Sequence, residues 1–228
     1  MSSPKNIVLE AKNISKYFGT ITALENVNLT VKQGECLGVV GDNGAGKSTF
    51  MKVLSGLYKP SSGSLFFNGN KETLNSPKDS QNLGLEMVYQ DLALAGNLPI
   101  GENIFLGREP TKKFGFLKLL DYKKIKELSE AHLDKLKIHV KSAEQKVEEL
   151  SGGQRQAIAI ARATAFNSKI VIMDEPTAAL AIKEVGKVLD LINSLKKMGV
   201  SVIIISHRMD DIFAVCDRVM ALFQGTNF

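Results

Sequence analysis

Short apolar runs and amphipathic helical patterns alternate along two parts of this chain. The apolar runs at residues 35–40, 170–173 and 200–205 predict short strands. Apolar side chains at helical spacing predict helices at residues 46–57 and 183–198, and Lys196, Lys197 and Gly199 close the second one. Apolar strands separated by amphipathic helices are typical of a parallel sheet covered on both faces. We therefore predict an α/β fold.

The first third of the chain has a different pattern. Segments 6–14, 21–31 and 64–68 are rich in β-branched and aromatic residues and are separated by glycines. We expect them to form an N-terminal antiparallel β subdomain.

The middle of the chain predicts helices without strands. A helix is expected at 121–137, with Ile125, Leu128 and Leu136 on its apolar stripe and His132 as a packed or capping histidine. A second helix is expected at 152–166. We therefore divide a single domain of 228 residues into a core, residues 1–90 and 167–228, and an inserted α-helical subdomain, residues 91–166.

Composition excludes several classes of protein. With 44% hydrophobic and 23% charged residues, the chain is neither disordered nor a disulfide-stapled miniprotein. Its purely apolar runs fall far short of the roughly 18 residues that a spanning helix needs. The N-terminal segment reaches Glu10 before a signal-peptide core could form. We expect a cytosolic protein in which Cys36 and Cys216 are buried, reduced thiols.

The net charge of +5 is concentrated in one segment. Residues 111–141 hold nine lysines against four acidic residues, which accounts for the whole excess. Such a segment is either a solvated helix face or a basic patch for nucleic acid or anionic lipid. Because nothing in the segment resembles an RNA or DNA module with interleaved aromatics, we expect no nucleic acid partner.

A glycine-rich loop follows the predicted strand at 35–40. It has the phosphate-binding spacing of a glycine, four residues, and Gly-Lys-Ser. Backbone N–H groups of such a loop converge on phosphate oxygens, and the next helix adds the positive end of its dipole. Lys47 can reach the β- and γ-phosphates, and the Ser48 hydroxyl can ligate Mg²⁺. The expected phosphate-binding residues are Gly41, Asp42, Asn43, Gly44, Ala45, Gly46, Lys47, Ser48 and Thr49.

Two acidic residues end the apolar run at 170–173. Paired acids at this position are often only a polar strand end, but beside a phosphate loop they have a chemical use. We expect Asp174 to hold Mg²⁺ through its water shell and Glu175 to polarise the attacking water.

Residues 150–154, Leu-Ser-Gly-Gly-Gln, open the predicted helix at 152–166. Ser151 and Gln154 have the spacing of a capping box. Gly152 and Gly153 make the first turn costly, by roughly 1 kcal/mol each relative to alanine. Capping does not explain that cost, whereas the approach of bare backbone N–H groups to an anion does.

These motifs together resemble the ATP-binding subunit of an ABC transporter over essentially the whole chain. Residues 150–154 resemble the signature of that family, and Glu175 directly follows Asp174 as in its hydrolysing members. The resemblance implies a P-loop NTPase fold with a mostly parallel core sheet. It also implies that ATP and Mg²⁺ are bound.

The resemblance implies roles for three further residues. Gln90 corresponds to a glutamine that senses Mg²⁺ and couples to the membrane partner. His207 corresponds to a switch histidine that contacts the γ-phosphate, and Phe18 to an aromatic ring that stacks on adenine. The expected catalytic residues are Glu175, His207 and Gln90, and the expected metal ligands are Ser48, Gln90 and Asp174.

The resemblance also implies the partners. Two copies would sandwich two ATP molecules, each between one copy's phosphate loop and the other copy's Ser151, Gly152, Gly153 and Gln154. Integral membrane permease subunits, served by a sugar-binding protein, would form the path, with this chain peripheral at the inner face of the cell membrane. Residues 88–94, 102–109 and 175–180 are similar to ATPases of monosaccharide importers.

Two alternatives stay open at the level of sequence. One is a soluble ABC-type ATPase acting on DNA or ribosomes, although Gln90 and Ser151 are too close for a long coiled coil and only one phosphate loop is present. The other is a module that no longer hydrolyses ATP, against which Glu175 and His207 argue. One departure from the family is Ala181, where an aspartate is usual in a loop that communicates between the two sites of a dimer, so we expect the coupling between those sites to be less tight. The chain also ends at Phe228, earlier than its relatives, as a truncated chain would.

Overall fold

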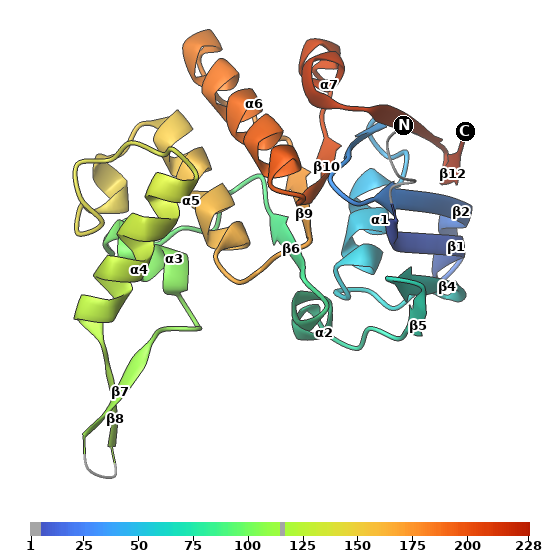
Figure 1. Cartoon of the computed structure of the whole chain (residues 1–228). Helices are drawn as coiled ribbons and strands as arrows, with labels where there is room; N and C mark the ends of the chain where they lie inside the picture. The colour runs from blue at the N-terminus through green and yellow to red at the C-terminus, as the bar shows by residue number, and fades with distance from the viewer. Residues whose placement is uncertain (1–5, 115–116) are drawn as a thin grey trace.

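The computed structural model describes residues 6–114 and 117–228 (Figure 1). The extreme N-terminal residues considered above, 1–5, lie outside the described residues. In the described part, two larger β-sheets and a set of α-helices pack around two hydrophobic cores. No helix there is long and apolar enough to cross a bilayer.

The larger sheet has the strand order β12-β11-β3-β10-β9-β6, and all its pairs are parallel except β11 with β12. Along β10, Val202 and Ile204 enter one core while Ile203 and Ile205 enter the other. The predicted parallel sheet covered on both faces is therefore confirmed. Its strands are β3 (Cys36–Val40), β6 (Leu85–Val88), β9 (Ile170–Asp174), β10 (Ser201–Ile205), β11 (Arg218–Phe223) and β12 (Thr226–Asn227).

Helices pack on both faces of this sheet. One face shares a core with α1 (Lys47–Leu54), through side chains such as Phe50 and Leu54. The other face shares a core with five helices, which Figure 1 shows in green to red. These are α3 (Ile100–Phe105), α4 (Tyr122–Lys135), α5 (Gly152–Thr164), α6 (Ile182–Lys197) and α7 (Met209–Val215). The short helix α2 (Pro77–Asn82) lies beside β6.

The N-terminal sheet is antiparallel, as predicted, with the order β2-β1-β4-β5. It packs on the α1 side of the core sheet. Its strands are β1 (Ile7–Phe18), β2 (Ile21–Lys32), β4 (Ser62–Phe67) and β5 (Asn70–Glu72).

The predicted helices of the middle segment are present, with one error in the apolar stripe of α4. Leu128 is 41% exposed, and Leu133 is buried instead. His132 is packed as expected, with Nε2 2.9 Å from the Ala161 carbonyl oxygen. Before the signature, the segment also contains a short 3-10 helix, Val147–Glu149.

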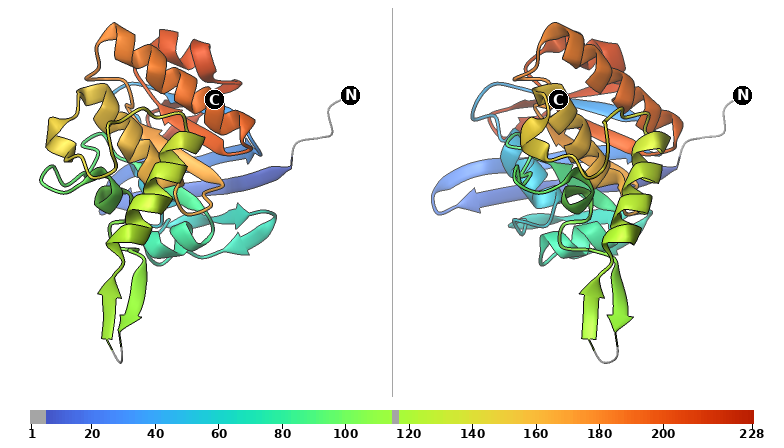
Figure 2. Two further views of the ribbon diagram at one scale, coloured as in Figure 1. Left: turned by 60° about the vertical axis from the view of Figure 1, so that its left-hand side comes forward. Right: turned by 90° about the vertical axis from the view of Figure 1, so that its left-hand side faces the viewer.

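A β-hairpin in the lysine-rich segment was not predicted. Strands β7 (Thr111–Phe114) and β8 (Leu117–Leu120) pair antiparallel and project away from the body (Figure 2). Exposed Leu117 and Leu119 alternate with Lys118 along β8, a pattern too short and too charged to be distinguished from a solvated loop.

Candidate functional site

The carboxyl ends of three core strands meet at one edge of the sheet. Asp174, at the end of β9, pairs with Ile205 of β10, and Ile205 pairs in turn with Val39 of β3. The phosphate loop begins at Gly41, directly after the last residue of β3, and His207 lies two residues beyond the end of β10. Ligands of open α/β sheets bind at this kind of edge.

The phosphate loop has a backbone path that requires glycine. A Cβ atom added to Gly41 would lie 2.2 Å from the Leu222 carbonyl oxygen, and one added to Gly46 would lie 2.8 Å from that of Ala23. Gly44 also has a positive φ, but a Cβ there would meet nothing within 4 Å. The loop is thus held by β11 and β2 on one side and faces open space on the other, as a phosphate cradle must.

Lys47 begins α1 and points back into the loop. Its side chain is buried, and Nζ donates hydrogen bonds to the carbonyl oxygens of Gly41, at 2.6 Å, and Asp42, at 2.9 Å. Ser48 is exposed and Thr49 is half-buried in the same first turn. The positive charge therefore lies inside the loop, beside the N–H groups of the helix N-terminus.

Glu175 and His207 face each other across the strand ends. Glu175 Oε1 lies 3.3 Å from His207 Nε2, and the His207 N–H donates a 3.4 Å hydrogen bond to Glu175 Oε2. The side chain of Glu175 is 11% exposed and that of His207 is 52% exposed. Glu175 also has a left-handed φ of 49°, a conformation that is costly for a residue other than glycine and is concentrated at functional sites.

One oxygen of Glu175 lacks a donor. Within residues 6–114 and 117–228, Oε1 is buried and accepts no hydrogen bond, because its contact with His207 lacks hydrogen-bond geometry. A buried carboxylate oxygen without a donor is costly unless a water or ligand supplies one.

The surroundings of Asp174 disfavour the ionised form of its carboxyl group. Burial raises the pKa of its carboxyl above the ordinary value, and the nearby Lys47, Lys52 and His207 side chains only partly oppose that rise. An additional cation beside Asp174 would stabilise the ionised form.

Gln90 and Phe18 are both accessible from solvent. Gln90 is exposed two residues beyond β6, whose last residue pairs with β9 next to Asp174. Phe18 is 42% exposed at the end of β1, and its ring packs edge-to-face on Tyr58 with centroids 5.4 Å apart. Gln90 therefore lies near the acid pair, and Phe18 presents a supported aromatic ring.

The signature residues form the predicted capping box. Ser151 Oγ accepts a hydrogen bond from the Gln154 N–H, and Gln154 Oε1 accepts one from the Ser151 N–H. This box starts α5, which packs in the core opposite to that of α1. Within one chain, the signature and the phosphate loop therefore belong to helices on different faces of the core sheet.

Glu184, a residue that was not predicted to have a role, lies against the signature. Its Oε1 accepts hydrogen bonds from the Ser151 hydroxyl, at 2.8 Å, and the Gly153 N–H, at 3.2 Å. A Cβ atom on Gly153 would lie 2.8 Å from the Glu184 Cβ, so glycine permits this approach. Of the signature's backbone N–H groups, that of Gly153 therefore contacts an anion in the single chain, and this anion is a carboxylate 31 positions away. A glutamate in the first turn of α6 is common, so the sequence held no signal for it.

Comparisons with known proteins agree with this geometry. The ABC transporter family profile matches residues 24–178. The chain is 48% identical to the xylose/arabinose import ATP-binding protein XylG of Sulfolobus acidocaldarius, over 96% of the chain and 85% of that protein. It is 42% identical to the ribose import ATP-binding protein RbsA of Caldanaerobacter subterraneus subsp. tengcongensis, over 96% of the chain but only 43% of that protein.

Solved structures show the same fold. A nucleotide-free ATP-binding cassette from an ABC transporter superposes with a TM-score of 0.85 at 28% identity, over 97% of this chain and 90% of that one. A dimeric cassette in a post-hydrolysis state with ADP and Pi superposes with a TM-score of 0.77 at 28% identity, over 96% and 95%. The predicted P-loop NTPase fold is confirmed, and the chain belongs to the ABC transporter family as an ATPase of the ATP-binding cassette type.

Proposed function

We propose that this chain is the ATP-hydrolysing subunit of a monosaccharide importer and acts as a pair of copies closed around two ATP molecules. The observation that carries the proposal is the meeting of the phosphate loop with Asp174, Glu175 and His207 at one sheet edge. The names of the relatives, which import xylose, arabinose or ribose, support the choice of substrate class.

Lys47 is already placed for a triphosphate. Its ammonium is bound to two loop carbonyls, and it can exchange those partners for phosphate oxygens without leaving the loop. In a loop with this spacing, backbone N–H groups converge on phosphate oxygens. Phe18, supported by Tyr58, offers a face for the adenine ring.

The residues beside the loop fit Mg²⁺. No cluster of three or more His, Cys, Asp or Glu side chains able to hold a metal exists among the described residues. Mg²⁺ bound with nucleotide needs none, since it takes phosphate oxygens, waters and one or two protein oxygens. Ser48, Gln90 and the charge-strained Asp174 supply such oxygens. Mg²⁺ would neutralise charge on the β- and γ-phosphate oxygens.

Glu175 is the residue best placed to accept a proton from water. Its free oxygen, Oε1, can take a hydrogen bond from a water molecule at the γ-phosphate end of the site. His207, half exposed and held against Glu175 through its backbone N–H, can donate to a γ-phosphate oxygen. These two side chains therefore orient the nucleophile and the phosphate together.

A second copy completes each site. Because α1 and α5 pack on opposite faces of the core sheet, one chain does not bring its own Ser151 to its own Lys47. A partner facing the carboxyl edge could place Ser151 and the first N–H groups of α5 on the phosphate. The dimeric cassette with ADP and Pi to which this chain is similar supports that arrangement.

A groove next to Gln90 fits a helix of the membrane subunit. It encloses about 260 Å³ and is lined by Tyr89, Leu92, Ile104 and Phe166, among others. Arg108 supports one side of the groove. Its Nη2 donates a 2.7 Å hydrogen bond to Glu86 Oε1, and its Cζ lies 4.5 Å from the Phe166 ring centroid. A permease helix seated here would touch the segment that leads to Gln90, which links transport to the ATP site.

Uptake of labelled sugars tests this function. Cells lacking the chain should lose uptake of at least one pentose or hexose, and the full chain should restore it. Glu175→Gln should not restore uptake, while it should still bind ATP because the amide keeps the size of the side chain. Unchanged uptake of every sugar tested, with the chain bound instead to ribosomes or DNA, would overturn the proposal.

A further inference from the structure

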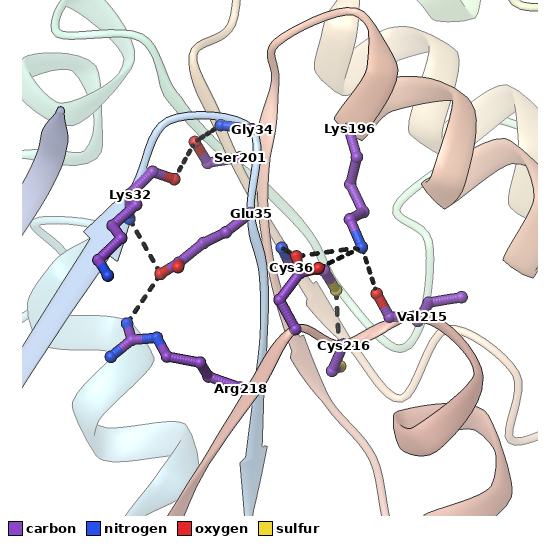
Figure 3. A network of polar contacts seen from close by, with 10 residues as sticks. Lys32, Gly34, Glu35, Cys36, Lys196, Ser201, Val215, Cys216 and Arg218 are labelled. Carbon is purple, nitrogen blue, oxygen red and sulfur yellow. Dashed lines mark hydrogen bonds and ion pairs between the residues drawn. The ribbon is translucent and has the colours of Figure 1, made fainter. Parts of the chain in front are cut away.

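The two cysteines of the chain meet, although they lie 180 positions apart. Cys36 begins β3, and Cys216 follows the last turn of α7, two residues before β11. Their sulfur atoms are 3.5 Å apart, and both thiols are free (Figure 3). Cys36 is buried as predicted, but Cys216 is only half-buried, so the expectation of two buried thiols was wrong for Cys216.

The backbone holds this pair in place. The Cys36 N–H donates to Asp217 Oδ2, and the Asp217 N–H donates to the Cys36 carbonyl oxygen, both at 2.8 Å. Gly38 leaves the space that Cys216 fills, because a Cβ there would lie 3.2 Å from the Cys216 sulfur. The approach of the sulfurs thus follows from the pairing of β3 with β11 and not from a chance rotamer at the surface.

The two thiols have different chemical character. The hydrogen bond between the two thiols lowers the pKa of the Cys216 thiol, and the nearby Lys196 ammonium lowers it further. The same hydrogen bond, together with burial, raises the pKa of the Cys36 thiol. Lys196 is fixed at this spot, since its Nζ donates a 2.7 Å hydrogen bond to the Val215 carbonyl oxygen. Cys216, the more accessible thiol, is therefore the better nucleophile.

The geometry points to a modification site at which Cys36 and Cys216 close to a reversible disulfide. The sulfurs need to approach by about 1.5 Å to reach the bond length of a disulfide.

A peroxide or a small disulfide such as oxidised glutathione would serve as the oxidant. With peroxide, the Cys216 thiolate attacks one oxygen, the O–O bond breaks, and one water leaves after protonation. Cys36 then attacks the sulfenic sulfur, loses its proton, and a second water leaves. In sum, two thiols lose two protons and two electrons while one peroxide becomes two waters. With oxidised glutathione, the Cys216 thiolate attacks one sulfur and one glutathione thiolate leaves; Cys36 then loses its proton and attacks the Cys216 sulfur of the mixed disulfide, and the second glutathione leaves.

The bond would join two parts of the site's framework. Cys36 precedes the phosphate loop on β3, and Cys216 links α7, the helix after His207, to β11. Closing so long a loop restricts the unfolded chain strongly, and we expect oxidation to raise the melting temperature by roughly 5–15 °C. Neither sulfur touches the phosphate loop, so ATP binding should survive.

Intact-protein mass spectrometry tests the proposal on the full chain. After hydrogen peroxide or oxidised glutathione, we expect a species two hydrogen atoms lighter, a peptide linking Cys36 to Cys216, and full recovery with dithiothreitol. A mass gain of oxygen or glutathione that persists on Cys216, a cross-link between two copies, or two thiols unchanged after treatment would each overturn it.

Two variants separate the roles of the thiols. Cys36→Ala should keep one adduct on Cys216 and form no disulfide, while Cys216→Ala should leave Cys36 unmodified by the same treatment. Neither variant should show the oxidant-dependent rise in melting temperature. Because Cys36→Ala opens a small space in the core, each variant is compared with its own reduced form. A rise in melting temperature in either variant would contradict the assignment.

Discussion

The Ser151 hydroxyl donates a 2.8 Å hydrogen bond to Oε1 of Glu184, and the Gly153 N–H donates to the same oxygen. These two groups are the donors that the proposed dimer offers to the phosphate of the partner's ATP. They hold the pKa of the Glu184 carboxyl below its ordinary value, so the group is ionised at neutral pH. In the single chain, a carboxylate therefore occupies the position expected for phosphate.

Removing the charge of Glu184 should favour closure on ATP. In a Glu175→Gln background, which retains ATP, Glu184→Gln should lower the ATP concentration for half-maximal dimerisation by roughly 3–10-fold, because a charge-assisted hydrogen bond no longer competes. Size-exclusion chromatography with ATP and Mg²⁺ measures this. Glu149→Gln is the matched control, since it removes an exposed charge near the signature but no such bond. An equal shift in both variants would contradict the competition.

The ionised carboxylate of Asp174 should lower the stability of the fold at pH 7, although hydrolysis requires it. Its pKa is raised by burial, so the folded state loses stability as pH rises from about 4 through the raised value. Asp174→Asn should therefore melt at a higher temperature than the parent at pH 7, and the difference should vanish below pH 4. Hydrolysis should fall by roughly 10–100-fold as a partner of Mg²⁺ is lost. A variant that is less stable at pH 7 would show that Asp174 is favourably placed without a metal.

Ala181 is the N-cap residue of α6, and its side chain makes no capping hydrogen bond. Ala181→Asp should stabilise the fold by about 1 kcal/mol, because its carboxylate can accept a hydrogen bond in the first turn. That gain corresponds to a rise in melting temperature of roughly 2–4 °C. Ala181→Val, which offers no acceptor, should give no rise. If Ala181→Asp also gives none, then the absent family aspartate does not matter for the stability of α6.

Phe18 should contribute to nucleotide affinity through its exposed face. Phe18→Ala should weaken ATP binding by roughly 5-fold or more, since stacking on a base is worth about 1–3 kcal/mol. Phe18→Tyr should bind as the parent does, because it keeps the ring and its contact with Tyr58. Isothermal titration calorimetry measures both. Unchanged affinity in Phe18→Ala would place the adenine elsewhere.

Much of the fold could be predicted from the sequence, because local patterns determine it. The run from Ile170 to Met173 is apolar at every position since both faces of β9 are buried, and the capping box of Ser151 and Gln154 is a local motif. Long-range contacts could not be predicted. The spacing of residues along the sequence predicts neither the hydrogen bond from Ser151 to Glu184 nor the contact between Cys36 and Cys216. The hairpin of β7 and β8 was missed because its leucines are exposed among lysines.

A mixture of two inactive variants tests the shared site most directly. Lys47→Ala disables every site built on that chain's phosphate loop, and Ser151→Arg disables every site completed by that chain's signature. A mixed dimer has one site with both lesions and one with none, so a one-to-one mixture should return up to about a quarter of parental phosphate release. Each variant alone should give none. If heterodimers are shown to form but hold no ATP at the intact site, the signature does not act on the partner's nucleotide, and the proposed sandwich is wrong.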